Sequence, residues 1–392
     1  MSFLPSDFIN DTVKTIPPSG IRKFFDIAAE MKDAISLGVG EPDFITPWHI
    51  RDEGIYSLEK GKTHYTSNAG LKELRCEVAA YLKRRFGLNY DGLSQVLVSV
   101  GGSEAIDLFL RTVIRPGDEV LIPEPSFVCY KPLTRLAGGV PVTINTRAEN
   151  DFRLTPDELS AAITPRTKVL ILPYPSNPTG RIMSRDDLAA LAPVIEEHNL
   201  MVLSDEIYGE LTYGQKHTSI ASIPGMYERT VLVSGFSKTY AMTGWRLGYA
   251  CGHPDIIKMM TKVHQFSIMS APTTAQYAAI SALKNGDNDI EYMKNEYNKR
   301  RNIIVSGFNS MGLSCFEPKG AFYCFPSIQS TGLSSSDFCE KLLYGKQVAV
   351  IPGTAFGESG EGFIRCSYAY SVESINRALE RIEDFLNDCR KA

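Results

Sequence analysis

Between about residues 47 and 285, short apolar runs alternate with longer stretches in which apolar positions recur at helical spacing. The runs are rich in β-branched residues and apolar at consecutive positions, which is typical of strands buried on both faces of a parallel sheet. They lie at residues 95–100, 118–123, 168–173, 200–205 and 230–235. Residues 184–199, between two of the runs, have the pattern of an amphipathic helix. This alternation predicts an α/β fold with a mostly parallel sheet flanked by helices.

The pattern changes after about residue 285. We expect a charged helix at residues 289–312 and another helix between residues 323 and 347. Two strands at residues 347–352 and 363–369 and a final helix at residues 371–389 follow. The final helix carries one apolar stripe, formed by Ile375, Leu379, Ile382 and Leu386. The chain is therefore predicted to form a large domain from residues 47–285. Residues 286–392 and the Pro-rich residues 1–46 are predicted to form a smaller α+β domain.

The composition excludes several classes of protein. The 392 residues are 43% hydrophobic and carry a net charge of −4, without a basic block that could bind nucleic acid. The apolar runs are too short to span a bilayer, and the N-terminal sequence lacks a signal-peptide pattern. The eight cysteines contain no C-x-x-C pair. We expect a cytoplasmic protein that binds no metal, nucleic acid or membrane.

Ligands of open α/β sheets bind at the carboxyl ends of the strands, so the residues after each run are candidates for a site. After the first run, Gly101, Gly102 and Ser103 lead into an apolar helix. Free backbone N–H groups and the positive end of the helix could bind an anion such as phosphate there. The alternative is a plain strand-to-helix turn in which Ser103 caps the helix.

The next three strand ends each carry a candidate with an ordinary structural alternative. Phe127 could stack on a planar ligand or belong to the core. Asn177, in an Asn-Pro turn, could aim its amide at a ligand oxygen or only shape the turn. Asp205, followed by Tyr208, could hold a charged ring nitrogen or cap the next helix.

The fifth strand end carries Lys238, with Arg246 further along the same segment. A lysine is usually solvated, but this one follows a buried strand among apolar and small residues. That setting suits a desolvated amine, which is nucleophilic because its neutral form is populated. Together, the five strand ends supply what is needed to hold pyridoxal 5′-phosphate, a flat pyridine that bears a phosphate, a hydroxyl and an aldehyde.

The motifs G-G-S-E-A, P-S-F-x-x-Y, P-S-N-P-T-G, S-D-E-I-Y, S-G-F-S-K-T-Y-A-M-T-G-W-R-L-G-Y and F-I-R-C-S-Y-A occur in this order. The set closely resembles the class I and II aminotransferases of pyridoxal-phosphate fold type I, over nearly the whole chain. Residues 20–33, K-G-A-F-Y and V-I-P-G-T-A-F-G look like the aspartate and aromatic branch. The resemblance implies a homodimer that moves the amino group of an L-amino acid to a 2-oxo acid such as 2-oxoglutarate. The cofactor would alternate between its aldehyde and amine forms in a ping-pong cycle.

The resemblance also implies roles for residues around the cofactor ring. Lys238 would bond covalently to the cofactor aldehyde and then move the substrate proton. Asp205 would pair with the protonated ring nitrogen. Tyr208 and Asn177 would hydrogen-bond the ring hydroxyl oxygen, and Phe127 would stack on the ring.

Other residues would hold the cofactor phosphate. The backbone of residues 101–103 and the guanidinium of Arg246 would bind it, together with a serine. That serine is Ser237 or Ser234, because its offset from the lysine varies within the family. Tyr65 would reach the phosphate of the neighbouring subunit.

Arg365 would bind the substrate α-carboxylate with both arms of its guanidinium, assisted by the Gly40 backbone and the Asn177 side chain. Candidates for the side-chain pocket are Ile21, Phe24, Tyr65, Phe322, Tyr323 and Phe356. Their apolar and aromatic character favours aromatic or broad amino donors. No arginine can be assigned to a second carboxylate, so the use of aspartate is left open.

Two other functions fit parts of the pattern. A C–S β-lyase, or another fold type I enzyme, would share the lysine, aspartate and Asn-Pro apparatus. A ligand-sensing module of a transcription regulator would carry an added DNA-binding domain, for which the motifs starting near residue 36 leave no room.

Overall fold

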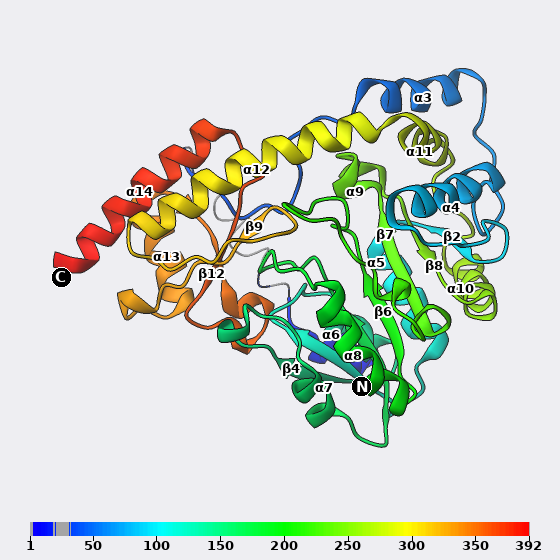
Figure 1. The fold of residues 1–392 in the computed structure, drawn as a ribbon, viewed down its shortest axis with the longest axis horizontal. Helices are drawn as coiled ribbons and strands as arrows, with labels where there is room; N and C mark the ends of the chain where they lie inside the picture. Colours follow the sequence, from blue (N-terminus) through cyan, green and yellow to red (C-terminus); the bar gives the residue numbers. More distant parts are fainter. Residues whose placement is uncertain (1–2, 19, 21–30, 32, 392) are drawn as a thin grey trace.

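The structure is a computed structural model that describes residues 3–18, 20, 31 and 33–391. In this part of the chain, a seven-stranded sheet has the order β2-β8-β7-β6-β5-β3-β4 (Figure 1). Its strands are β2 (Val96–Ser99), β3 (Glu119–Glu124), β4 (Val140–Asn145), β5 (Thr167–Leu172), β6 (Met201–Asp205), β7 (Thr230–Gly235) and β8 (Gly248–Cys251). Strands β4, β3, β5, β6 and β7 run parallel, and β8 is antiparallel to both of its neighbours. The predicted mostly parallel sheet is confirmed, and the five predicted runs form β2, β3, β5, β6 and β7.

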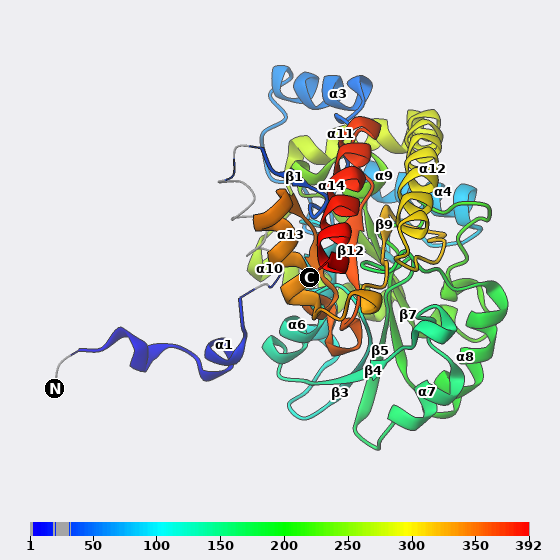
Figure 2. The same cartoon turned by 90° about the vertical axis from the view of Figure 1, so that its left-hand side faces the viewer.

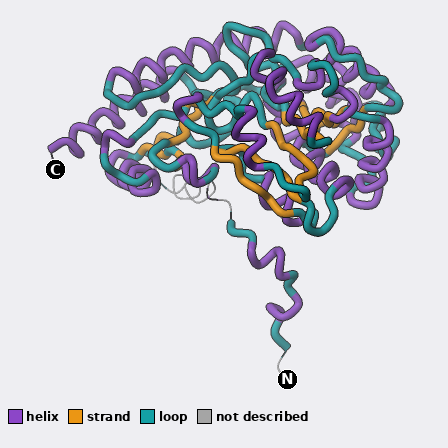
Figure 3. Tube along the Cα trace, turned by 60° about the horizontal axis from the view of Figure 1, so that its bottom comes forward, coloured by secondary structure: helices purple, strands orange, loops and turns teal. Residues whose placement is uncertain are grey.

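Helices cover both faces of this sheet (Figure 3). They are α3 (Trp48–Glu59), α4 (Lys72–Phe86), α5 (Gly102–Val113), α6 (Tyr130–Leu136), α7 (Pro156–Ala162), α8 (Arg185–Glu197), α9 (Phe236–Thr239), α10 (Pro254–Ser267) and α11 (Thr273–Asn285). Successive side chains of a strand point to opposite faces. In β7, Val231 and Val233 pack with α5, α6 and α10, whereas Leu232 packs with α4 and α11. Both faces are therefore apolar, as the runs predict.

The C-terminal part forms a smaller α+β unit (Figures 1 and 2). It contains α12 (Asp287–Ser310), α13 (Ser335–Lys346), α14 (Val372–Lys391), β9 (Tyr323–Cys324), β10 (Val348–Ala349), β11 (Ile351–Pro352) and β12 (Ile364–Ser367). The predicted stripe of α14 is buried, with Leu379 its most exposed member at 9%. Strand β1 (Ile35–Ser36) pairs with β10 in this unit. The domain boundaries at residues 46/47 and 285/286 stay predictions.

Several strands differ from the expected pattern, among them the two-residue strands β1 and β9, which were not predicted. The strand expected at residues 347–352 is divided, because β10 pairs with β1 whereas β11 pairs with β12. A run of apolar residues does not show that the chain changes its partner at Val350. Strand β4 was not predicted because it lies at the sheet edge, is partly exposed and contains Pro141, which an edge strand tolerates. The short β8, Gly248–Cys251, was also missed.

The N-terminal segment, with η1 (Pro5–Phe8) and α1 (Asp11–Thr15), extends away from the body (Figures 2 and 3). The pocket candidates Ile21 and Phe24 lie outside the described residues. Among the described helices, none combines the length and the apolar character that crossing a bilayer requires.

Candidate active site

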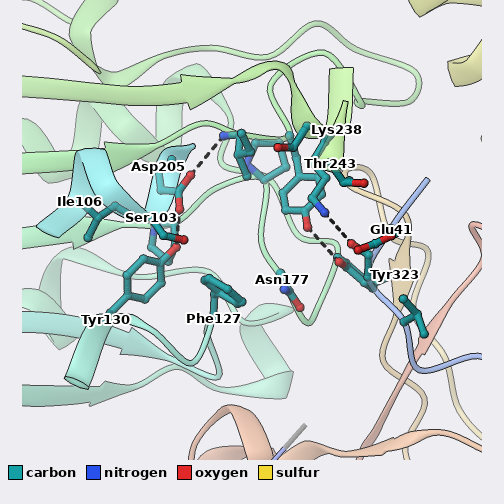
Figure 4. Close-up of a pocket in the computed structure, with 18 of the residues that line it drawn as sticks. Glu41, Ser103, Ile106, Phe127, Tyr130, Asn177, Asp205, Lys238, Thr243 and Tyr323 are labelled. Carbon is teal, nitrogen blue, oxygen red and sulfur yellow. Dashed lines mark hydrogen bonds between the residues drawn. The ribbon is translucent and has the colours of Figure 1, made fainter. Parts of the chain in front are cut away.

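A cavity of about 360 Å³ opens where the carboxyl ends of the parallel strands meet the smaller unit (Figure 4). Most of the predicted site residues line it: Gly40, Gly102, Ser103, Phe127, Asn177, Asp205, Tyr208, Ser237, Lys238, Arg246 and Arg365. They come from segments far apart in the sequence. The residues that follow the strand ends, together with Gly40 and Arg365, which the resemblance adds, therefore lie together in space.

One end of the cavity is formed by a glycine turn, a helix N-terminus and a guanidinium. Gly101, with φ 81°, turns the chain into α5, and a Cβ there would lie 2.5 Å from the guanidinium of Arg246. The positive φ favours glycine, and a larger residue would also displace the guanidinium from this end of the cavity. Gly102 and Ser103 line the cavity at the start of α5, where backbone N–H groups lack helical partners. A helix N-terminus beside a guanidinium fits a phosphate group.

The two candidate serines differ in position. Ser237 lines the cavity, in α9 directly after β7. The Ser234 hydroxyl points elsewhere and donates to the backbone carbonyl of Glu206 at 3.2 Å. Of the two, Ser237 is therefore the serine positioned beside the anion-binding end.

Asp205 ends β6 and is 7% exposed. Its carboxylate accepts from the Tyr130 hydroxyl at 2.8 Å and from the backbone N–H of Ile207 at 3.2 Å, so both donors are neutral. Burial raises the pKa of this carboxyl, and the bond from Tyr130 opposes that rise. A buried carboxylate held only by neutral donors fits a ligand that carries a positive charge, such as a protonated ring nitrogen.

Lys238 lies in α9, and its Nζ donates to the backbone carbonyl of Gly40 at 2.5 Å. The pKa of Lys238 is lowered from 10.5 to about 8, chiefly by burial. The carboxylate of Glu41 opposes this lowering, and the positive charges of Arg365 and Arg246 contribute to it. The neutral amine is therefore accessible near physiological pH, as a nucleophilic lysine requires.

Arg365, in β12, is 2% exposed and lies between the rings of Tyr323 and Phe356, with its guanidinium carbon 4.6 and 4.7 Å from their centroids. One Nη donates to Asn177 Oδ1 at 2.9 Å, and the other donates to the carbonyl of Gly38. Within the described chain, its buried Nε has no partner. A buried cation that has only neutral acceptors fits a carboxylate ligand.

Aromatic residues complete the walls of the cavity. The hydroxyl groups of Tyr208 and Tyr323 lie 2.9 Å apart, and both residues line the cavity. Phe322 and Phe356 are buried behind this wall rather than lining it. Phe322 packs against Tyr208, and Phe356 packs against the arginine guanidinium. These two candidates therefore support the pocket from behind.

Tyr65 does not reach the cavity of its own chain. Its side chain is 80% exposed, on the loop after α3. The sequence interpretation also gave no role to Tyr130 or Glu41, which line the cavity (Figure 4). The spacing of P-S-F-x-x-Y was a signal for Tyr130, because it follows the stacking candidate Phe127 by about one helical turn.

The fold and the cavity thus define an α/β protein in which a buried lysine of lowered pKa shares one cavity with a helix N-terminus, a guanidinium and a buried carboxylate. Residues 32–382 match the family described as aminotransferase class I and II. The putative aminotransferase YugH of Bacillus subtilis (strain 168) is 52% identical over 97% of this chain and 99% of that protein. The aromatic-amino-acid aminotransferase 2 of Thermococcus litoralis is 44% identical over 97% of this chain and 98% of that protein.

A solved structure agrees with these relatives. The aspartate aminotransferase of Thermus thermophilus with maleate has a TM-score of 0.92 and 37% identity, over 96% of this chain and 99% of that chain. The chain belongs to the class I and II aminotransferase family. It has the fold type I architecture and transfers amino groups from amino acids to 2-oxo acids. The predicted family, fold and reaction are confirmed, and neither the lyase nor the ligand-sensing alternative is favoured.

Proposed function

We propose that the enzyme works with pyridoxal 5′-phosphate held at this cavity and uses aromatic or a broad range of neutral amino acids as donors. The observation that carries the proposal is Lys238, whose pKa is lowered to about 8 inside the cavity. When bound, the cofactor supplies an electron sink that stabilises negative charge at the substrate Cα. The residues present fit its phosphate, ring nitrogen and aldehyde.

Different residues of the chain would bind different parts of the cofactor. Residues 101–103, Ser237 and Arg246 would hold the phosphate, and Asp205 would hold the ring nitrogen. Asn177 and Tyr208 would contact the ring hydroxyl, with Phe127 against the ring. The ring would thereby be fixed relative to the Lys238 amine.

Lys238 would also carry the proton during turnover. Its neutral Nζ can accept a proton from the substrate Cα, and the resulting ammonium can return the proton to a neighbouring carbon. The carbonyl of Gly40, 2.5 Å from Nζ, is placed to orient the amine. The same residue would therefore bind the cofactor covalently and act as general base and general acid.

The charges that line the cavity indicate which class of donor side chain the enzyme accepts. Of the described residues, the basic side chains that line the cavity are Lys238, Arg246 and Arg365, and the proposal gives each of them a role. Among the residues that the structure describes, no positive charge at the cavity is left for a second substrate carboxylate, and Glu41 adds a negative charge to the wall. Relatives are named for both aspartate and aromatic amino acids. The cavity of this chain favours the aromatic and neutral class.

A donor panel tests this substrate class. We expect phenylalanine and tyrosine to convert the bound cofactor from its aldehyde form to its amine form with higher kcat/KM than aspartate. We expect 2-oxoglutarate or pyruvate to regenerate the aldehyde form. Stopped-flow absorbance of each half-reaction measures both steps. A preference for aspartate over every aromatic donor would contradict the assignment of neutral side chains, and would leave the cofactor and the reaction type intact.

Substitution of Arg365 tests how the α-carboxylate is bound. We expect Arg365→Ala to raise the half-saturation concentration roughly 10- to 150-fold, since hydrogen bonds to charged groups contribute about 1.5–3 kcal/mol. Arg365→Lys keeps the charge but not the planar fork, so it should recover only part of the loss. Steady-state kinetics with several donors measures the effect. Unchanged half-saturation for every donor would rule out this role.

The proposed homodimer is supported by an exposed apolar surface around α3. This surface, the α3 patch, consists of Ile45, Trp48, Ile55, Tyr56, Leu58, Tyr65, Phe266, Ile268 and Met269. Thr273 donates to the carbonyl of His64, and Asn68 donates to that of Met269, so the loop after α3 lies beside the end of α10. Apolar patches of this kind are typical of protein interfaces. Tyr65 in this patch would complete the cavity of the second copy.

Light scattering tests the dimer. We expect twice the chain mass of 43.4 kDa. Trp48→Asp, in the α3 patch, should shift the protein toward monomer and weaken cofactor retention. Tyr344→Asp is the matched control, because Tyr344 on α13 is equally exposed at 60% but lies outside the patch. A fully active species of single-chain mass would disprove the shared site.

A further inference from the structure

A buried histidine lies behind the anion-binding end of the cavity. His264 of α10 is fully buried, and its Nδ1 is 2.9 Å from Oε1 of Glu104. Glu104 is the third residue of α5, and its Oε2 accepts from the backbone N–H of Val100, before the glycine turn. The carboxylate therefore reaches back across the turn to the residue before the N-cap Gly101, one position further than in a capping box.

The surroundings of His264 indicate which nitrogen carries its proton. Within the described chain, its buried Nε2 has no hydrogen-bond partner. An imidazolium would leave a charged, buried N–H without an acceptor, which is costly. The neutral tautomer with the proton on Nδ1 avoids this cost. His264 then donates to Glu104, and both oxygens of that carboxylate are occupied.

Glu104 carries a charge that conflicts with the proposed phosphate site. The N-terminus of a helix attracts carboxylates of its own first turn as it attracts phosphate. Gly102 and Ser103 line the cavity, whereas Glu104 does not. Its carboxylate is thus held outside the cavity, although it belongs to the same helical turn. The bond from His264 is the side-chain contact that holds it there.

We propose that His264 is a positioning residue that keeps the Glu104 carboxylate bonded to Val100 and away from the N–H groups of Gly102 and Ser103. By this means it sets the affinity of the site for the phosphate group of the cofactor. The inference rests on the proposed function. It adds His264 of α10, which does not line the cavity, to the groups that determine cofactor binding.

Two substitutions of His264 separate the hydrogen bond from packing. His264→Leu is similar in size but cannot donate, whereas His264→Asn places an amide N–H near the position of Nδ1. Apoprotein is titrated calorimetrically with inorganic phosphate, with pyridoxal 5′-phosphate and with pyridoxal. We expect H264L to bind the two phosphate-bearing ligands roughly tenfold more weakly, which is the order of one charge acting at a helix N-terminus. H264N should bind them nearly as the native chain does.

Pyridoxal and Glu104 supply the controls. Pyridoxal lacks phosphate, so its affinity should be the same in H264L and the native chain. In the double variant H264L/E104Q no carboxylate remains to compete, so phosphate affinity should return to within about twofold of the native value. E104Q alone should bind phosphate at least as tightly as the native chain. Melting temperatures show whether each variant is folded.

The possible results are distinct. If H264L/E104Q binds phosphate as weakly as H264L, or if pyridoxal binding falls equally, the proposal is overturned. A tenfold loss in E104Q alone also overturns it, and this arm does not depend on H264L folding. If the native apoprotein binds neither pyridoxal 5′-phosphate nor pyridoxal, the proposed function fails instead.

Discussion

Lys238→Ala is expected to abolish covalent attachment of the cofactor and to reduce turnover to the detection limit. In the native chain the neutral amine, favoured by a pKa of about 8, is placed in the cavity and oriented by the Gly40 carbonyl. Alanine supplies neither the amine that bonds to the aldehyde nor the group that carries the proton. Borohydride reduction followed by peptide mass mapping measures attachment, and transamination of phenylalanine measures turnover.

Two controls accompany this variant. Lys238→Arg keeps a positive charge, but a guanidinium is not deprotonated in proteins, so attachment should also be lost. Lys216→Ala, at an exposed lysine of a loop, should behave as the native chain. A borohydride adduct that persists in Lys238→Ala, or an adduct mapped to another lysine, would falsify the assignment.

The pH dependence of attachment follows from the lowered pKa. The neutral form of Lys238 increases as pH rises through about 8, so the rate of cofactor uptake by apoprotein should rise with pH and level off above that value. An ordinary lysine would level off more than two pH units higher. Stopped-flow absorbance between pH 6 and 11 measures the profile, and a rate still rising at pH 10 would contradict the lowered pKa.

The central sheet could be predicted because burial on both faces leaves a strong pattern in the sequence. Strands β3, β5, β6 and β7 are buried along most or all of their length, so apolar residues occupy consecutive positions. Strand β4 is partly exposed at the sheet edge, and its mixed composition resembles a loop. At residues 347–352 the apolar pattern is strong but incomplete as a guide, because a continuous apolar run cannot reveal that β10 and β11 have different partner strands.

The site could be predicted where residues follow strands, and not where contacts depend on packing between helices. Lys238 and Asp205 each end or directly follow a buried strand, and both reach the cavity. The contact of His264 with Glu104 joins residues 160 positions apart and depends on how α10 lies against α5. The role implied for Tyr65 requires a second copy of the chain, which no feature of one cavity can show.

Asp205→Asn is expected to leave cofactor bound but to slow turnover on the order of 10³-fold. A paired negative charge raises the pKa of a neighbouring basic group by up to about 3 units, and each unit is tenfold in its protonated fraction. Asparagine keeps the shape and can still accept from Tyr130, but it has no charge to hold a proton on the ring nitrogen. Single-turnover absorbance with phenylalanine measures the loss, and calorimetry shows whether the cofactor is bound.

Tyr130→Phe separates the charge of Asp205 from its positioning. The Tyr130 hydroxyl donates to Asp205 and opposes the rise in its pKa caused by burial. Without this bond the carboxyl should have a higher pKa, so the acidic limb of the pH–rate profile should move to higher pH while the rate at alkaline pH falls only a fewfold. If Asp205→Asn were as active as Tyr130→Phe at alkaline pH, the carboxylate charge would not be what activates the ring. If the acidic limb stayed unmoved in Tyr130→Phe, the protonation of Asp205 would not be what limits the enzyme in acid.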